Sequence, residues 1–340
     1  MRERAFKGPL FVVGMSRSGT TLLREVLNRN PEVGIPSAEA LFIPYIIRRF
    51  RAKLFPLERQ QAHEFQHILK ESKFFDKLRA KGLLLQDSEL DLILKLKSLE
   101  EIIETLMRFF VPADTKKSGF IWGDKSPNYL LSIGLLKSFF PSARFIHIIR
   151  DPRDRALSAH KAWGANIYIA AERWRKGIKT ARQQSQVFRE DYLEVFYEKF
   201  TGSPDKGLKQ ICEFLGINYD ESMLELNSPV EVYAEIGAET RQTTRIVPDN
   251  TKKYLHELNP GQIKRIDEIV FPVADALDYC PMHQGTTYVP LAGLQNMTCF
   301  LADNFNAFTW HIRRFGVTAG IKYLRGRSRM AIANKLPDSD

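Results

Sequence analysis

Long apolar runs are missing from this sequence of 340 residues, and so are several other signatures of specialised protein classes. No apolar stretch reaches the roughly 18 residues that a membrane span requires. The first apolar run, at residues 10–13, is too short for a signal peptide, and no small-residue cleavage site follows it. Internal repeats and low-complexity segments are also missing. We therefore expect a globular protein that is not secreted.

Cysteine is scarce, with only Cys212, Cys280 and Cys299 in the whole chain, and no Cys-x-x-Cys pair. An odd, sparse count in a chain that is not exported indicates reduced thiols rather than a disulfide framework. We therefore expect a cytoplasmic location.

Charge is abundant and unbalanced. Hydrophobic residues make up 44% and charged residues 26%, which fits a globular core and excludes a disordered, collagen-like or coiled-coil protein. The net charge is +10, and residues 286–340 contribute +4 of it through 7 Lys/Arg against 3 Asp/Glu. A basic balance favours an anionic partner, although a solvated basic surface is the plain alternative.

The hydrophobic pattern predicts strands that alternate with helices. Such an order is typical of an α/β fold, a three-layer parallel sheet with helices on both faces. We expect a main domain over 1–285 with a mostly helical insertion over 45–120, and a basic C-terminal extension over 286–340. The predicted strands are 9–14, 144–149 and 191–197, and the predicted helices are 19–29, 128–140, 205–215 and 260–278, with a largely helical stretch at 45–110.

The first strand-to-helix turn, Gly14-Met-Ser-Arg-Ser-Gly-Thr-Thr21, resembles a P-loop. In such a loop, main-chain N–H groups at a helix N-terminus bind a phosphate. The usual Lys after the second glycine is replaced by Thr20, and the positive charge comes from Arg17 instead. The loop therefore suits an anion but lacks the Lys-Ser/Thr pair of a magnesium–triphosphate site.

The second such turn, Ile149-Arg-Asp-Pro-Arg-Asp-Arg-Ala-Leu-Ser158, follows the second strand. Pro152 suits the first position of a helix, so Arg150 and Ser158 can approach one anion from two sides. The alternative is a helix-start cluster in which Asp151 and Asp154 pair with the arginines.

These segments together resemble the sulfotransferases that use 3′-phosphoadenosine 5′-phosphosulfate (PAPS). The loop at 14–23 resembles their 5′-phosphosulfate loop, Arg150–Ser158 their 3′-phosphate motif, and Ile211–Asp220 a later helix-to-loop segment. Within that family the tyrosylprotein and bacterial type is the most similar, because Pro31-Glu-Val33 follows the loop. The resemblance implies a P-loop nucleotide-kinase-like fold and transfer of a sulfuryl group to a hydroxyl-bearing acceptor.

The resemblance also implies roles for individual residues. Glu39 matches the catalytic base once one residue is inserted before it, and Lys125 of Lys125-Ser-Pro127 matches the lysine that contacts the sulfuryl group. His160 is the next candidate base. The Arg-Lys-Gly triplet of the cytosolic enzymes is missing, and we expect the segment Thr243-Thr-Arg-Ile-Val-Pro248 to replace it at the cofactor. The implied catalytic residues are Glu39, Lys125 and Arg17, and the implied PAPS-binding residues are Arg17, Ser18, Gly19, Thr20, Thr21, Arg150, Ser158 and Thr243.

Three other readings stay open. A P-loop kinase-like phosphotransferase would need magnesium, whereas we expect no metal. The segment His63-Glu-Phe-Gln-His67 fits the zinc-protease pattern His-Glu-x-x-His, but no third ligand follows it. A non-catalytic nucleotide-binding interaction protein is the third reading, and no nucleic-acid motif supports a nucleic-acid partner.

The C-terminal extension contains a basic, partly amphipathic piece between Trp310 and Arg327. Such a segment can lie on a membrane surface or on a partner. A helix packed back on the domain is the alternative. Peripheral membrane contact is the functional interpretation of this tail, and both interpretations stay open. The acceptor and the oligomeric state are not encoded in any readable motif.

Overall fold

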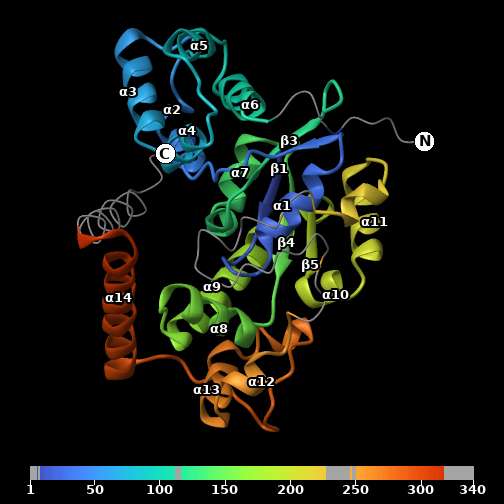
Figure 1. Cartoon of the computed structure of the whole chain (residues 1–340), viewed down its shortest axis with the longest axis vertical. Helices are drawn as coiled ribbons and strands as arrows, with labels where there is room; N and C mark the ends of the chain where they lie inside the picture. The colour runs from blue at the N-terminus through green and yellow to red at the C-terminus, as the bar shows by residue number, and fades with distance from the viewer. Residues whose placement is uncertain (1–5, 7, 112–115, 227–245, 247–249, 318–340) are drawn as a thin grey trace. The chain divides into compact units, whose positions relative to one another are not determined.

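The computed structural model describes residues 6, 8–111, 116–226, 246 and 250–317 (Figure 1). The chain divides into two compact units. Unit 1 consists of Met1–Ile149, Gln183–Val230 and Thr243–Ile246, and unit 2 of Arg150–Arg182, Glu231–Gln242 and Val247–Asp340. Each unit is described by itself.

Unit 1 is built on a five-stranded parallel sheet with the order β2-β3-β1-β4-β5. The central strand β1 sets Val12 opposite Lys125 on one side and Ile146 on the other. Because all strands run the same way, their carboxyl ends meet at one edge, where ligands bind in such sheets. The strands are β1 (Leu10–Val13), β2 (Val33–Gly34), β3 (Ile121–Lys125), β4 (Arg144–Ile149) and β5 (Tyr192–Phe196).

The sheet is held by a fully buried apolar layer. Every residue of β1 is shielded from solvent, as expected for a central parallel strand. Phe11 stacks on Phe145 with ring centroids 5.4 Å apart and meets Tyr129 edge-on at 5.8 Å. The predicted α/β class, a parallel sheet flanked by helices, is confirmed (Figure 1).

The helices of unit 1 largely follow the sequence pattern, including the helical stretch predicted at 45–110. The predicted helix at 128–140 is divided into a 3₁₀ segment η2 (Pro127–Leu131) and α7, because the chain leaves helical geometry at Ser132. Helices α1 (Thr20–Asn28), α2 (Ile43–Phe50), α3 (Arg59–Lys70), α4 (Lys73–Ala80), α5 (Asp87–Ile93), α6 (Leu99–Phe109), α7 (Ile133–Phe139), α10 (Tyr197–Gly202) and α11 (Pro204–Leu215) belong to this unit, with 3₁₀ segments η3 (Gln186–Asp191) and η4 (Glu221–Leu224).

Unit 2 is helical. Its centre is the buried Trp174, whose indole N–H donates to the carbonyl of Arg150 over 2.9 Å. The predicted helix at 260–278 ends early, at Val270, and a short 3₁₀ turn follows. The helices are α8 (Pro152–Trp163), α12 (Tyr254–Glu257), α13 (Pro260–Val270) and α14 (Gly293–Phe315), with η6 (Asp275–Leu277), while α9 (Ile167–Ser185) continues into unit 1. Within the residues that the structure describes, no helix is both long and apolar enough to cross a bilayer.

Candidate active site

The first predicted turn forms a tight loop between β1 and α1. Three of its residues have left-handed or otherwise positive φ, namely Gly14 (152°), Arg17 (76°) and Gly19 (96°). A Cβ on Gly14 would lie 2.5 Å from the carbonyl oxygen of Ile148, and one on Gly19 would lie 2.6 Å from the Tyr197 ring. Both positions therefore require glycine. Arg17 takes the same region at an energetic cost, which is typical of functional loops.

The start of α1 is suited to an anion. Gly19 is its N-cap, so no side chain caps the helix, and the first turn carries no acidic residue. The first N–H groups of a helix and its dipole both favour negative charge at this position. The Ser18 side chain is 1% exposed, and its hydroxyl has no hydrogen-bond partner within the described parts of the chain. A buried hydroxyl without a partner at a helix N-terminus fits an oxygen of a bound phosphate or sulfate.

The structure brings Glu39 and Lys125 together. Lys125 is the last residue of β3 and is 5% exposed, and its Nζ donates to Glu39 Oε1 over 2.5 Å. Burial lowers the pKa of Lys125, and the charge of Glu39 opposes that shift. The two predicted catalytic side chains thus form one charge-assisted contact in unit 1.

The segment that carries Glu39 is irregular, and buried side chains fix it at the next residue. The N–H of Ala40 donates to Asp124 Oδ1 over 3.2 Å, and the carbonyl of Ala40 accepts a hydrogen bond from the Tyr129 hydroxyl. Asp124 precedes Lys125 in β3, and Tyr129 follows in η2. One short stretch of chain therefore provides both Lys125 and the clamp on the Glu39 segment.

Two charged groups complete this part of the site. Burial raises the pKa of Asp124 to about 6, while the Ala40 N–H opposes the shift. Arg24 of α1 is also buried and donates to the carbonyl of Ser37 over 2.6 Å. Its positive charge contributes to the lowered pKa of Lys125. The positive charges of Arg24 on α1 and Lys125 on β3 therefore both lie near Glu39.

The second predicted turn belongs to unit 2 and follows the end of β4 directly. Arg150 is buried, and one of its terminal nitrogens donates to the carbonyl of Asn250 over 2.6 Å. Pro152 is the first residue of α8, as predicted, and the Asp151 side chain caps the helix by accepting from the N–H of Arg153. Ser158 lies on the same helix and is partly exposed. The motif therefore has the predicted turn-to-helix geometry.

The alternative of a helix-start ion cluster is partly correct. Arg153 forms a two-point ion pair with Asp151, with contacts of 2.7 and 3.0 Å, so its charge serves the local structure. Asp154 accepts main-chain N–H groups of Lys252 and Tyr254. Burial raises its pKa, and the charge of Arg150 opposes the shift.

Comparison with known proteins assigns the family. A sequence model described as the sulfotransferase family matches residues 9–221, which include the loop, Glu39, Lys125 and the Arg150 motif. The chain belongs to the sulfotransferase family. The predicted resemblance is confirmed at this level.

Individual relatives of this sulfotransferase are distant. Protein-tyrosine sulfotransferase 2 of Gallus gallus is 26% identical over 296 residues, covering 82% of this chain and 71% of the relative. Protein-tyrosine sulfotransferase 1 of Danio rerio is 23% identical over 288 residues, covering 80% and 72%. An uncharacterised protein of Aquifex aeolicus is 25% identical over 234 residues, which cover 66% of this chain but only 27% of that protein.

Solved structures share the fold. The sulfotransferase domain of the Synechococcus PCC 7002 olefin synthase aligns with a TM-score of 0.54 at 21% identity, covering 77% of this chain and 94% of that domain. The sulfotransferase domain of the curacin biosynthetic pathway gives 0.52 at 19% identity, covering 80% and 98%. At these identities the likeness concerns the fold alone.

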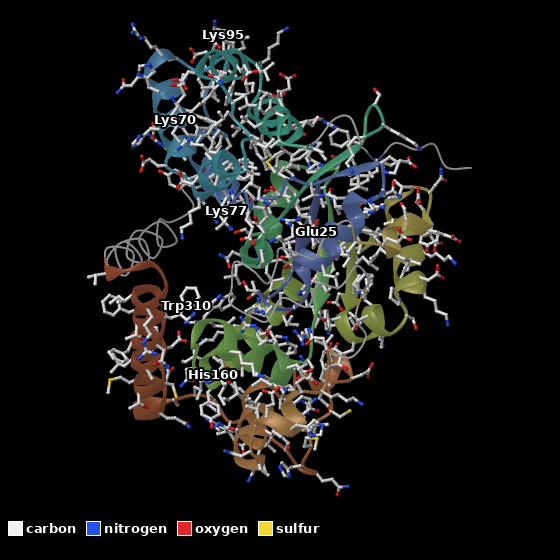
Figure 2. The ribbon with its side chains drawn as sticks, in the orientation of Figure 1. Glu25, Lys70, Lys77, Lys95, His160 and Trp310 are labelled. Carbon is white, nitrogen blue, oxygen red and sulfur yellow. The ribbon has the colours of Figure 1, made fainter. Side chains whose placement is uncertain are left out.

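The structure bears differently on two further predicted site residues, Thr243 and His160. Thr243 lies outside the described residues, so its predicted role stays a prediction. His160, the alternative base, is an exposed residue of α8 (Figure 2), and its Nδ1 lies 2.9 Å from the carbonyl oxygen of Ala165. That contact ties one ring nitrogen to the end of its own helix.

The zinc-protease pattern at 63–67 lies on α3, and its glutamate, Glu64, forms an ion pair with Arg49. Both carboxylate oxygens of Glu64 accept from the Arg49 guanidinium, at 2.7 and 3.0 Å. This pair lowers the pKa of Glu64. Across the described ranges, no group of three or more His, Cys, Asp or Glu side chains is placed to hold a metal ion.

Sequence reasoning missed Arg24, Asp124 and Tyr129. Arg24 lies outside both phosphate motifs, and its contact with Ser37 spans an irregular loop. Asp124 and Tyr129 flank the Lys125-Ser-Pro127 segment, so their proximity to that motif is the one signal that the sequence offers. Their bonds to the Ala40 main chain depend on a fold that places residues 84 and 89 positions apart in contact.

Proposed function

We propose that this sulfotransferase moves a sulfuryl group from PAPS to an acceptor hydroxyl by in-line displacement. The observation that supports this most directly is the contact between Glu39 and Lys125, a base and a cation joined over 2.5 Å in the unit that also carries the anion loop. The family match supports sulfuryl transfer as the class of reaction.

The residues of the loop fit the anionic end of PAPS. The buried Ser18 hydroxyl, the uncapped start of α1 and Arg17 would bind the 5′-phosphosulfate, with Gly19, Thr20 and Thr21 in the same turn. Arg150 and Ser158 would bind the 3′-phosphate, because an arginine fork on phosphate is a strong, charge-assisted contact. Thr243 is proposed as a further PAPS contact.

The reaction requires a proton acceptor and charge stabilisation. As the acceptor oxygen bonds to sulfur, its proton passes to the Glu39 carboxylate. The bond between sulfur and the bridging oxygen of PAPS breaks, and the electron pair remains on the departing 5′-phosphate. Lys125, Arg17 and the loop N–H groups would stabilise that charge, so positioning and electrostatics carry most of the rate enhancement.

The ion pair with Lys125 fixes the position of the Glu39 carboxylate. The contact with the Lys125 ammonium fixes one oxygen of the Glu39 carboxylate and leaves the other oxygen for the acceptor. The clamp on Ala40 fixes the neighbouring main chain. Holding a base within a fraction of an ångström of its working position is a requirement for efficient general-base catalysis.

A tyrosyl peptide is the first acceptor to test, because the relatives from Gallus gallus and Danio rerio are named protein-tyrosine sulfotransferases. Sugar hydroxyls, lipid-linked glycans and small alcohols are the other classes. The helices between Ile43 and Phe109 are proposed to form the acceptor side.

The three cysteines form no disulfide, which supports the proposed cytoplasmic location.

Transfer of label from [³⁵S]PAPS to a panel of these acceptors tests the proposal. Label should move to at least one hydroxyl acceptor and not to its O-methylated analogue. Transfer of phosphate from [γ-³²P]ATP under the same conditions, with no transfer from PAPS, would favour the kinase-like reading and contradict the proposal.

A further inference from the structure

Helix α14 has its polar and apolar sides arranged opposite to those of an ordinary surface helix. Asp303 is 3% exposed and faces the rest of unit 2, where it accepts from the N–H of Asn166 over 3.0 Å and pairs with Arg173 over 2.7 Å. Asn306, one turn further, lies near Gly164. The side that packs on unit 2 is therefore anchored through polar groups.

The opposite side of α14 is apolar and exposed. Leu301 is 59% and Phe305 is 66% exposed, and both lie roughly half a turn away from Asp303. The spacing of the apolar residues follows the helical repeat over four turns, so they form one continuous stripe. This α14 stripe consists of the exposed Met297, Leu301 and Phe305 and the half-buried Phe308 and Ile312.

The charge that follows the stripe is of one sign. Residues 304–337 contain seven Lys/Arg and no Asp or Glu. Arg313 lies in the last turn of α14 and is exposed, and the other basic residues follow in the sequence. An apolar helix face that is followed in the sequence by a block of positive charge is the composition of helices that lie in the plane of an anionic membrane surface.

We propose that α14 docks on an anionic lipid surface, with the α14 stripe entering the boundary between headgroups and acyl chains. Clustered phenylalanine and leucine side chains are suited to that layer, and the basic residues meet the negative headgroups. The polar contacts of Asp303 would keep the helix attached to the rest of unit 2 while the stripe is buried.

A second copy of the chain is the main competing occupant of the stripe. Paired helices are typically flanked by acidic and basic residues that attract each other across the interface. Two copies of α14 would instead bring two basic segments together without an acidic partner in residues 304–337. The charge pattern therefore favours lipid over self-association.

Flotation of the full chain with vesicles tests the proposal. One set of vesicles is phosphatidylcholine, and the other contains about 30 mol % phosphatidylserine. The wild type should float with the anionic vesicles and much less with the neutral ones, and raising the salt from about 0.1 M to about 0.5 M should weaken binding. The double variant Leu301→Glu, Phe305→Glu should reduce the bound fraction at least about tenfold.

A matched control changes two exposed leucines of unit 1. Leu54→Glu with Leu92→Glu alters apolar surface and charge in the same way but leaves α14 intact, so binding should stay at the wild-type level. Circular dichroism confirms that each variant is folded. If the glutamate pair on α14 does not fold, the milder Leu301→Ala, Phe305→Ala pair replaces it, with weaker binding still expected.

Three results would overturn the proposal. The first is no flotation of the wild type at millimolar lipid. The second is equal flotation of the wild type and the α14 variant. The third is a wild-type dimer in sedimentation equilibrium that the α14 variant dissociates, without vesicle binding, which would assign the stripe to a second copy.

Discussion

Glu39 and Lys125 are separated by 86 residues in the chain and joined by a single contact in the structure. Sequence reasoning assigned them separate tasks, one as base and one as partner of the leaving group. Their pairing links these tasks, because a substitution of either residue removes the partner of the other. Kinetic constants and binding constants must therefore be compared together.

The substitution Glu39→Gln should lower kcat by about 10²-fold or more, with the affinity for 3′-phosphoadenosine 5′-phosphate near the wild-type value. Glutamine keeps the size of the side chain and an oxygen for Lys125, but it cannot take up the proton. Steady-state kinetics and calorimetry provide the two readouts. Glu190→Gln, at an exposed residue of unit 1 outside the helices proposed to form the acceptor side, is a matched control and should leave kcat unchanged.

Lys125 provides a contrast. Lys125→Ala should lower kcat and also weaken PAPS binding, since its charge already meets the anion in the ground state.

A Glu39→Gln enzyme with near-wild-type kcat would place the base elsewhere. His160 would then be examined first, although its Nδ1 contact with Ala165 leaves only the other ring nitrogen for catalysis.

Asp124 should make the free energy of unfolding depend on pH. Burial raises its pKa from 3.8 to about 6, so the folded state holds the proton more tightly than the unfolded state. The stability from this group is fully present below about pH 4 and is lost as the pH rises through 6. Asn at this position stays neutral throughout.

The stability of Asp124→Asn relative to wild type should therefore increase between pH 4 and pH 7, by about 2–3 kcal/mol at most. Urea unfolding at several pH values measures the difference. Parallel curves for wild type and Asp124→Asn would show that the Asp124 carboxyl does not titrate in this range.

At the scale of elements, the loop between β1 and α1 depends on Gly19. A Cβ there would meet the Tyr197 ring at 2.6 Å, whereas Gly216, also left-handed at φ 70°, has no atom within 4 Å of such a Cβ. Gly216→Ala should cost about 1 kcal/mol from backbone strain alone. Gly19→Ala should cost about 1–3 kcal/mol more from crowding, and nucleotide affinity should fall at least about tenfold. Equal losses in thermal unfolding and unchanged affinity would contradict this account of the loop.

The elements that the sequence predicts well are those with strong local signals. β1 is a continuous apolar run, β4 is apolar except for Arg144 and His147, and α1 and α8 begin at a glycine loop and a proline. The strand β3 was missed because its sequence, Ile-Trp-Gly-Asp-Lys, ends in two charged residues that only the tertiary fold buries. The two-residue strand β2 has too little pattern to be predicted.

The candidate site also combines parts that local sequence predicts with parts that only the tertiary fold brings together. The loop and the Arg150 motif are each one continuous stretch of the sequence, so their residue types and spacing can be read directly from it. The clamp on Ala40 joins a main-chain group to side chains of β3 and η2, and no local pattern encodes such a contact. The polar anchoring of α14 through Asp303 is likewise visible only in the structure.

At the scale of the whole molecule, PAPS-dependent transfer should survive removal of divalent metals. The loop has Thr20 where a magnesium–triphosphate site has lysine, and its charge comes from Arg17. Turnover in EDTA should match turnover in magnesium. Loss of transfer in EDTA, restored by magnesium, would favour the kinase-like mechanism.

We propose that the chain recognises a nucleotide with phosphates at both its 5′ and 3′ positions. The proposal assigns the 5′ end to the loop of unit 1 and the 3′-phosphate to Arg150 and Ser158. AMP lacks the 3′-phosphate, so it would leave the second set of contacts unused. This claim can be tested without knowledge of the acceptor.

Calorimetric titration with 3′-phosphoadenosine 5′-phosphate and with AMP is the most direct measurement. The bisphosphate should bind about 10²-fold more tightly than AMP or better, since each charge-assisted contact contributes about 1.5–3 kcal/mol. Arg150→Ala should remove most of that difference and leave AMP binding nearly unchanged. Equal affinities of the wild type for the two nucleotides would contradict the account.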